Sequence, residues 1–322
     1  MTLDQTATIG RDRCSSPGVR LMRASQLMRS ARTEPEVGFR TDAASPGPLA
    51  LLREGLGDIA SRRPLIRWLV EADMKKRGSD TALGNLWWVM DPLLQMVVYV
   101  IFVTIITSRK IPEYPLFIFA AILPWKWFNA AVIDATKSLL EADRLIKRIQ
   151  FPKIVLPLAA TTAGVIGFAF GLIPLAGIML FYPDRISPLV LLIPVIALVQ
   201  FVFTVAIALL VAAGNVFFRD LGNVAGHVLR LWWYLSPGLY SLAVLDQSGV
   251  FAHHKVLRFL VGANPFAILL EAYRSVIYGS TDGPPHLPDF ASLGVLLVAS
   301  LAFVGFATIV FKRLEPSFAK VL

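Results

Sequence analysis

A cassette of charged residues interrupts an otherwise apolar chain near its middle. Five of the eight residues from Glu141 to Arg148 are charged, and Phe151-Pro152 and a long apolar stretch follow. Between residues 137 and 150 the apolar side chains recur at spacings of three and four, at Leu139, Ala142, Ile146 and Ile149. This spacing is typical of one face of an α-helix. The cassette therefore predicts a short amphipathic helix whose other face is charged.

The charged face of this helix could bind a soluble partner. Asp143 and Lys147 are four residues apart, which allows an ion pair along the helix surface. Phe151 precedes Pro152, and a residue before proline disfavours the helical conformation, so we expect the helix to end there. The residues that could make the contact are Glu141, Asp143, Arg144, Lys147, Arg148, Phe151 and Pro152. A helix that lies on the membrane surface without a partner would have the same pattern.

The sequence contains no recognisable catalytic constellation. It has no P-loop, no Gly-x-Ser-x-Gly nucleophile turn, no His-Glu-x-x-His zinc motif and no Rossmann glycine pattern. With a single cysteine, Cys14, the chain cannot form an intrachain disulfide, and its four histidines lack a metal-ligand spacing. We therefore expect this chain to be no enzyme and to hold no metal or cofactor of its own.

Few charged residues fall inside the apolar stretches, among them Asp91, Lys126 and Asp134. An ion-coupled transporter would usually carry a more evident relay of buried acids. For Asp91 we expect a side chain that reaches toward the polar boundary, or that pairs with a basic residue of another helix, rather than a proton relay.

Aromatic residues gather near the ends of the apolar stretches and near proline breaks. They are Trp87, Trp125, Trp127, Phe128, Trp232, Trp233, Tyr234 and Tyr240. One interpretation is a belt of aromatic side chains at the membrane surface. The other is a path of flat rings on which the sugar units of a glycan stack while the polymer slides. The sequence leaves both interpretations open.

The elements that must position these residues are membrane-spanning helices. The chain has 322 residues, of which 56% are hydrophobic and only 16% charged, whereas soluble domains carry about 25% charged residues. The apolar stretches approach the roughly 20 residues that a bilayer requires of a helix. We predict an all-α polytopic membrane protein with six spans, at about 86–107, 114–136, 155–181, 187–213, 228–245 and 290–311. Pro237-Gly238 breaks the fifth span.

The distribution of basic residues orients these spans. With the N-terminus inside, 23 lysines and arginines lie on the inner side and six on the outer side. Because basic residues collect on the cytoplasmic side of membranes, both termini are predicted to be cytoplasmic. The net charge of +9 follows from the same rule, so nucleic acid is not an expected partner.

The remaining segments divide around this membrane domain. Residues 1–50 are polar and arginine-containing and are expected to form a disordered cytoplasmic tail. Residues 51–83 combine helical apolar spacing, basic residues and Trp68, which predicts an amphipathic helix in the membrane interface. Residues 84–314 form the transmembrane domain, and residues 315–322 a cytoplasmic tail.

A short helix is predicted between spans five and six. Asn264 can cap its start, Pro265 suits the first helical position and Gly279 can end it. With about 14 residues, it is too short to cross a bilayer. Residues 251–262 form a second short apolar piece. Two short helices that enter and leave the membrane from the same side would fit.

Six stretches in order carry a resemblance to a known family. They are LGNLWWVMDPLLQMVVY (83–99), YPLFIFAAILPWKWF (114–128), DRLIKRIQFPKIVLPLA (143–159), FFRDL (217–221), YLSPGLY (234–240) and NPFAILLEAYR (264–274). With these the chain resembles the permease subunits of ABC-2-type transporters that export lipid-linked polysaccharides such as O-antigen, teichoic acid, capsule-like polymers and galactan.

The resemblance implies an assembly and roles for several segments. It implies a homodimer with a channel at its interface, bound by two copies of a separate P-loop ATPase that holds ATP and Mg. The charged cassette would be the coupling helix, seated on that ATPase. The segment with Asn264, Pro265, Glu271 and Arg274 would be one of two re-entrant helices on the outer side.

The expected function is the ATP-driven export of a polyprenyl-diphosphate-linked polysaccharide across the bacterial cytoplasmic membrane, with a cell-wall galactan as one candidate cargo. The lipid diphosphate would need cations at the inner entrance, and the candidates are Arg67, Lys75, Lys76 and Arg77. These residues could equally serve only to orient the chain. The alternatives are an ABC-2 permease for a drug or small lipid, or a membrane-embedded glycan polymerase or glycosyltransferase.

Overall fold

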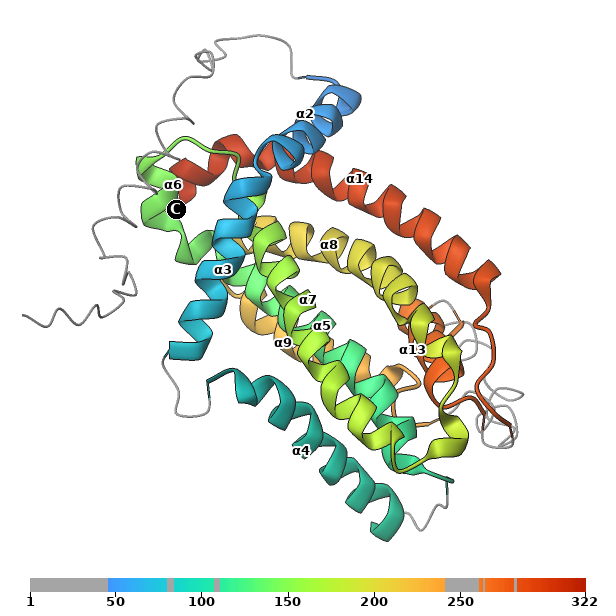
Figure 1. Ribbon diagram of the computed structural model, residues 1–322. Helices are drawn as coiled ribbons and strands as arrows, with labels where there is room; N and C mark the ends of the chain where they lie inside the picture. Colours follow the sequence, from blue (N-terminus) through green and yellow to red (C-terminus); the bar gives the residue numbers. More distant parts are fainter. Residues whose placement is uncertain (1–45, 80–83, 107–110, 241–260, 263, 281–282) are drawn as a thin grey trace, which may run out of the picture. The chain divides into compact units, whose positions relative to one another are not determined.

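A computed structural model shows how the helices are arranged (Figure 1). The chain divides into two units, Met1–Pro46 and Gly47–Leu322, and the second contains every element described below. The structure describes residues 46–79, 84–106, 111–240, 261–262, 264–280 and 283–322. The predicted disordered tail and the predicted second short helix at 251–262 therefore fall largely or wholly outside the described residues.

All regular structure in these ranges is helical, which confirms the predicted all-α class. The main helices follow one another as α2 (Pro48–Ser61), α3 (Arg63–Ser79), α4 (Trp87–Ile101), α5 (Tyr114–Glu141), α6 (Asp143–Arg148), α7 (Val155–Met179), α8 (Ile193–Phe217), α9 (Leu221–Leu235), α13 (Pro265–Ile277) and α14 (Phe290–Val321). A π-helical turn, Phe102–Ile106, continues α4, and a 3-10 turn, Pro188–Leu192, leads into α8.

Five of these helices are long and apolar enough to cross a membrane. They cover Trp87–Thr104, Tyr114–Glu141, Val155–Met179, Pro188–Phe217 and Phe290–Val321, close to five of the six predicted spans. The predicted span 228–245 corresponds in part to α9, which has 15 residues and ends at Leu235. Ser236 is extended, as the following Pro237 favours. Residues 241–245 are outside the described ranges, so the sixth span stays a prediction.

The helices at the two ends of the membrane domain differ in detail from the prediction. The segment 51–83 forms two helices, α2 and α3, instead of one, and they meet at Arg62. Pro64 lies in the first turn of α3, where its missing N–H costs nothing. At the other end α14 continues to Val321, so residues 315–321, predicted as a tail, extend the last span as a helix.

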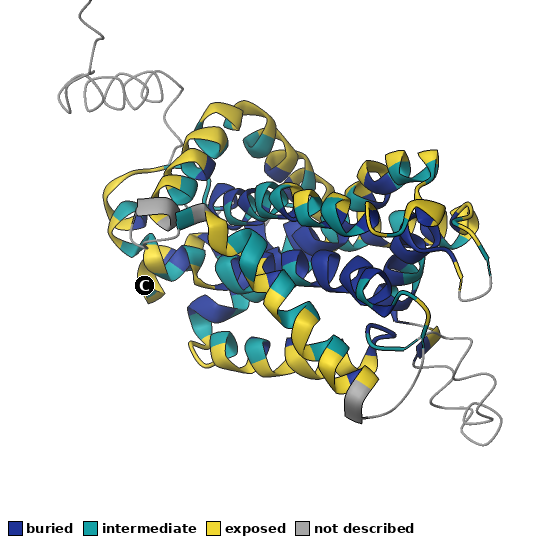
Figure 2. Ribbon diagram, turned by 60° about the horizontal axis from the view of Figure 1, so that its bottom comes forward, coloured by how far each residue is buried: buried dark blue, intermediate teal, exposed yellow. Residues whose placement is uncertain are grey.

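Helix α5 forms the centre of the bundle and contains many of the buried residues. Figure 2 shows that the buried residues concentrate in the interior of the bundle and the exposed ones on its periphery. It packs against α4, α7, α8, α9 and α13. In its most apolar stretch 78% of the residues are buried, against 11% for the stretch Trp87–Thr104 that includes α4. Much of α4 therefore presents apolar side chains outward, among them Leu94, Val97, Val98 and Ile101.

An aromatic cluster joins four helices at the middle of the bundle. The ring centroids of Phe128 (α5) and Phe266 (α13) are 4.5 Å apart, and those of Trp125 (α5) and Phe266 are 4.8 Å apart. Phe203 of α8 and Trp232 of α9 pack against the same rings. Large aromatic contacts of this kind add favourable geometry to the apolar area that they bury, so the cluster fixes the helices that surround the site described next.

Candidate functional site

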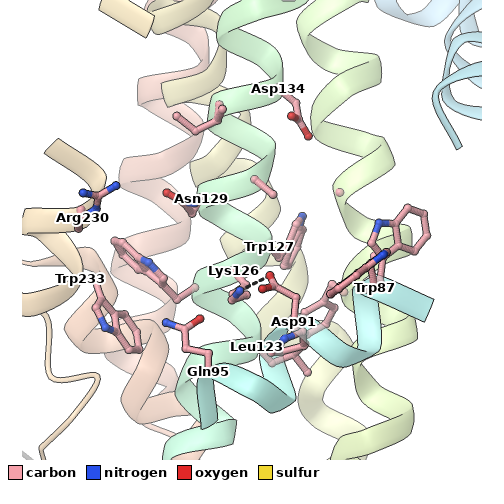
Figure 3. A pocket seen from close by; sticks show the side chains of 18 of the residues that line it. Trp87, Asp91, Gln95, Leu123, Lys126, Trp127, Asn129, Asp134, Arg230 and Trp233 are labelled. Atoms are coloured by element: carbon pink, nitrogen blue, oxygen red, sulfur yellow. Dashed lines mark hydrogen bonds and ion pairs between the residues drawn. The ribbon is translucent and has the colours of Figure 1, made fainter. Parts of the chain in front are cut away.

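A cavity of about 730 Å³ lies between α4, α5, α7 and α9 (Figure 3). Its volume is in the range of about 300–1,000 Å³ that is usual for small-molecule sites. The wall combines aromatic rings with polar side chains. The rings belong to Trp87, Trp88, Tyr99, Trp125, Trp127, Phe168, Trp233 and Tyr234, and the polar groups to Asp91, Gln95, Lys126, Asn129, Asp134 and Arg230.

The structure brings together five of the eight aromatic residues singled out from the sequence. Trp87, Trp125, Trp127, Trp233 and Tyr234 line the cavity. Three do not. Phe128 and Trp232 belong to the aromatic cluster, and the Tyr240 hydroxyl donates a hydrogen bond to the Leu235 carbonyl at 3.5 Å. Trp87 and Tyr234 are the most exposed of the five, so their rings are the most accessible to a ligand.

An ion pair crosses the cavity from α4 to α5. The Lys126 ammonium donates to the Asp91 carboxylate, as the dashed line in Figure 3 marks. Of the two alternatives predicted for Asp91, the structure confirms the pairing with a basic residue of another helix. A charge in an apolar segment is costly unless it is paired, so each residue lowers the cost of the other.

The polar face of α4 continues toward α9. Tyr99 accepts hydrogen bonds at its hydroxyl from Gln95 Nε2, at 3.2 Å, and from Trp233 Nε1, at 2.9 Å. The sequence analysis did not single out Gln95, Tyr99, Asn129 or Arg230. A signal existed for the first two, because Asp91, Gln95 and Tyr99 are spaced by four residues and so share one face of a helix.

A second hollow, of about 510 Å³, lies between α3, α5 and α7. Its polar lining consists of Asp73, Lys76, Asp134, Ser138 and Glu141. Asp134 lines this hollow as well as the aromatic cavity, so the two adjoin along α5.

The four candidate entrance residues are not gathered at this hollow. Lys76 lines it and lies 3.8 Å from the Glu141 carboxylate. Arg67 and Lys75 are exposed on α3 and do not line it, and the side chain of Arg77 is outside the described residues. Of the described candidates, Lys76 therefore lines the hollow, and it does so beside three acids, Asp73, Asp134 and Glu141.

The charged cassette forms the end of α5 and the short helix α6. The predicted ion pair between Asp143 and Lys147 is present, with 2.8 Å between Oδ1 and Nζ. The predicted helix end at Phe151 is wrong, because α6 ends at Arg148 and Ile149 is already extended. Ile149 is accordingly exposed rather than part of the apolar face, whereas Leu139 and Ile146 are buried as predicted.

Tertiary contacts explain why α6 ends early. The Lys153 amide donates to Glu315 Oε1 of α14 at 2.6 Å, and Phe151 packs into the apolar cluster that contains Phe318. These contacts require an extended segment after α6. Lys147 Nζ also donates to the Leu322 carbonyl at 2.8 Å. Helix α6 and the end of α14 thus lie together, and exposed charges remain at Glu141, Arg144, Lys147 and Arg148.

A buried lysine joins α14 to α2. The Lys312 ammonium lies 2.8 Å from Glu315 Oε2 and 3.4 Å from Glu54 Oε1, and it also pairs with Asp58. Since Glu315 in turn accepts the Lys153 amide, one network connects α2, α14 and the segment after α6. We call Lys312, Glu54, Asp58 and Glu315 the Lys312 network.

The predicted short helix is α13. The Asn264 side chain caps it by accepting the Phe266 amide at 3.0 Å, and Gly279 follows its end with φ +84°. Asn264 also accepts the Trp232 indole N–H at 2.9 Å and donates to the Ser236 hydroxyl at 2.8 Å. These bonds confirm the predicted start and end, and they attach α13 to α9.

Arg274 of α13 is buried and holds the turn after α9. Its guanidinium donates to the carbonyls of Pro237, Gly238 and Tyr240 and lies 3.9 Å from the centre of the Phe117 ring. Burial lowers the pKa of Arg274 to about 10, and the charge of Glu271 opposes this effect, so the guanidinium stays protonated at neutral pH.

Arg185 was not predicted as a site residue, and it ties together three segments at the same end of the bundle. Its side chain pairs with Glu113, with 2.6 Å between Nε and Oε2. It also donates to the carbonyls of Tyr278, Ser280 and Gly283. The start of α5, the 3-10 turn Pro183–Arg185 and the segment after α13 are therefore held by one side chain.

Long apolar helices, paired charges within the bundle and an aromatic-lined cavity define a multi-pass membrane protein of the transporter class. The O-antigen export system permease protein RfbA of Myxococcus xanthus is 30% identical to this chain over 258 residues, which are 80% of this chain and 95% of that protein. Two proteins of the same name from Klebsiella pneumoniae are each 26% identical over 256 and 255 residues, which are 79% of this chain and 93% of either relative. No protein-family model matches the chain.

The chain belongs to the family of O-antigen export permeases, the membrane subunits of ABC-2-type polysaccharide exporters. The predicted resemblance is confirmed at this level. The family also identifies the chain as a transport subunit of an exporter rather than as an enzyme.

Proposed function

We propose that this chain forms, with a second copy of itself, the channel of an ATP-driven exporter that moves a polyprenyl-diphosphate-linked polysaccharide across the bacterial cytoplasmic membrane. A separate P-loop ATPase, in two copies, would bind ATP and Mg and drive the cycle. A cell-wall galactan is one candidate cargo. Both ends of the chain would face the cytoplasm, as the distribution of basic residues favours.

The observation that carries this proposal is the aromatic cavity. Flat rings at Trp87 and Tyr234 offer exposed faces on which sugar units can stack, and the polar groups between them can exchange hydrogen bonds with hydroxyls. The outward apolar face of α4 beside this cavity is one surface against which a second copy could pack in place of lipid.

The proposed contact with the ATPase is α6. Its apolar residue Ile146 is buried, while Arg144, Lys147 and Arg148 remain exposed and can meet a soluble protein. Because Lys147 also bonds to the end of α14, a force applied to α6 would reach the last span directly. This contact supports a role of α6 in transmitting movement as well as in binding.

Charge reversal on α6 tests this contact. The variant Asp143→Lys, Arg144→Glu, Lys147→Glu and Arg148→Glu keeps an ion pair possible between positions 143 and 147 but reverses the charge of the face. In vesicles with the partner ATPase, we expect export to fall while the permease still inserts and folds. The control variant is Arg219→Glu, an exposed charge between α8 and α9. Undiminished export and ATPase stimulation in the α6 variant would contradict the proposed coupling.

The proposed entrance for the lipid diphosphate is tested by replacing the basic residues of α3 one at a time. Lys76 lines the hollow next to α5, whereas Lys75 beside it in the sequence does not. If the hollow admits the lipid diphosphate, Lys76→Gln should lower export of the lipid-linked glycan, and Lys75→Gln should change it little. Equal effects of the two variants would favour orientation by charge alone, and the same loss with Arg67→Gln would point to the membrane-facing side of α3.

A further inference from the structure

The aromatic cavity carries as many acidic as basic side chains. Asp91 and Asp134 supply two negative charges, and Lys126 and Arg230 supply two positive charges, so the formal charge of its lining is zero. Figure 3 shows these four side chains around the same space, with the uncharged amides of Gln95 and Asn129 between them. The balance is local, because the whole chain carries a net charge of +9.

The Asp91–Lys126 pair makes the part of the cavity around Lys126 unsuited to a charged ligand group. The Lys126 ammonium is already neutralised by the Asp91 carboxylate to which it donates. A carboxylate or phosphate on a sugar would have to compete with Asp91 for Lys126 and would be repelled by Asp91 itself. A cationic sugar would likewise have to compete with Lys126 for Asp91 and would be repelled by Lys126 itself.

The same residues suit an uncharged sugar. An ionised carboxylate accepts hydrogen bonds only, and an ammonium donates only, whereas a sugar hydroxyl does both. A hydroxyl can therefore donate to Asp91 and accept from Lys126 without breaking the ion pair, and the amides of Gln95 and Asn129 can add bonds of either direction. Because the aromatic rings stack on sugar faces without regard to charge, the polar groups are the part of the wall that can discriminate.

We propose that this cavity selects electrically neutral sugar units, and that the ion pair between Asp91 and Lys126 is the specificity determinant. The inference rests on the proposed function, because it assumes that the glycan passes through this cavity. It adds a substrate class to that function, namely an uncharged polysaccharide rather than one that carries uronic acids or phosphates.

The test uses the full chain in lipid nanodiscs and two probes of equal length, a neutral galactose tetrasaccharide and tetragalacturonate. Binding is followed by the fluorescence of the tryptophans that line the cavity. We expect the wild-type protein to bind the neutral probe about tenfold or more tightly than tetragalacturonate. One nearby unit charge shifts a pKa by at least about one unit, which corresponds to a factor of about ten in an equilibrium constant.

Three variants locate the discrimination. Asp91→Asn leaves Lys126 without its counter-charge and should shift the preference toward tetragalacturonate. Lys126→Gln should shift it further toward the neutral probe. The double variant keeps the lining neutral but lacks the ion pair, so its preference for the neutral probe should be weaker than that of the wild-type protein, while binding of the neutral probe shows that the site has not collapsed. The matched control, Glu71→Gln on the exposed surface of α3, changes the net charge by the same amount as Asp91→Asn and should leave the ratio unchanged.

The outcomes separate the two proposals. Equal binding of both probes to the wild-type protein, or a ratio that Asp91→Asn does not change, overturns the charge selection while the cavity remains a glycan site. A shift in Glu71→Gln equal to that in Asp91→Asn assigns the effect to the whole protein and also overturns it. Binding of neither probe to the wild-type protein removes the cavity from the glycan path, and the proposed function and this inference then fail together.

Discussion

Replacing Lys312 by methionine should destabilise the junction between α14, α2 and the segment after α6. The Lys312 side chain is only 6% exposed and pairs with Glu54, Asp58 and Glu315. Methionine retains the unbranched apolar stem but removes the positive charge. Three carboxylates would then face one another without a counter-ion, and Glu315 would still be fixed by the Lys153 amide.

The magnitude follows from the exposure of the three acids. Removing one partner of a buried ion pair costs about 3–5 kcal/mol, because the other charge is left unpaired. The side chain of Glu54 is 47% exposed, so water screens it and it contributes at most about 1 kcal/mol. The side chains of Asp58 and Glu315 are 22% and 11% exposed and account for most of the effect. We therefore expect a loss of about 3 kcal/mol, near the lower end of that range.

Unfolding in mixed micelles with increasing SDS, followed by tryptophan fluorescence, measures this loss. The triple variant Lys312→Met, Asp58→Asn, Glu315→Gln removes the repulsion and keeps an amide oxygen for Lys153, so it should recover most of the stability. The control is Arg313→Met, which removes an exposed charge one residue away. A Lys312→Met protein within about 0.5 kcal/mol of the wild type, the range of ordinary surface changes, would refute the reasoning.

Two further predictions concern the other end of the bundle. Arg274→Lys keeps the charge, but an ammonium cannot reproduce the planar guanidinium that donates to three carbonyls. Thermal unfolding of this variant should therefore occur at a lower temperature than that of the wild-type protein. An unchanged unfolding temperature would contradict this. Asp289 caps α14, and hydrogen bonds from the Ser292 hydroxyl and amide lower its pKa. The stabilisation of α14 by ionised Asp289 is therefore complete above the ordinary pKa of an aspartate and is lost as pH falls through the lowered pKa. Hydrogen exchange at the start of α14 should show this loss in the wild type and not in Asp289→Asn.

The long elements of this fold could be predicted because their determinants are local. Stretches of about 20 apolar residues are a direct requirement of the bilayer, and they correspond to five of the observed helices. The bounds of α13 were equally accessible, since Asn264, Pro265 and Gly279 act on their own neighbouring backbone. The pair Asp143–Lys147 belongs to the same class, because both members lie on one helical turn.

What could not be predicted depends on residues far apart in the sequence. Helix α6 ends before Phe151 because Lys153 binds Glu315, which is 162 residues away. The composition of the cavity depends on which faces of α4, α5 and α9 meet, and so Gln95 and Arg230 were missed. Lys312 is the clearest case, since the sequence places it at the end of a span, where a solvated charge is expected, and only the packing of α2 buries it.

Arg185 and the groups to which it donates should differ in their sensitivity to mutation. Its acceptors beyond Glu113 are the main-chain carbonyls of Tyr278, Ser280 and Gly283, and every amino acid supplies such a carbonyl. Substitutions at those three positions leave the acceptor atoms in place as long as the backbone keeps its course, whereas any change at Arg185 removes all the bonds at once. A deep mutational scan of this end of the bundle should therefore show tolerant positions at Ser280 and Gly283 beside an intolerant Arg185. Tyr278 should stay constrained, because its ring lies 4.7 Å from the Arg185 guanidinium and its hydroxyl donates to the Pro112 carbonyl. The start of α5 and the segment after α13 are thus joined through one arginine whose partners are mostly main-chain carbonyls.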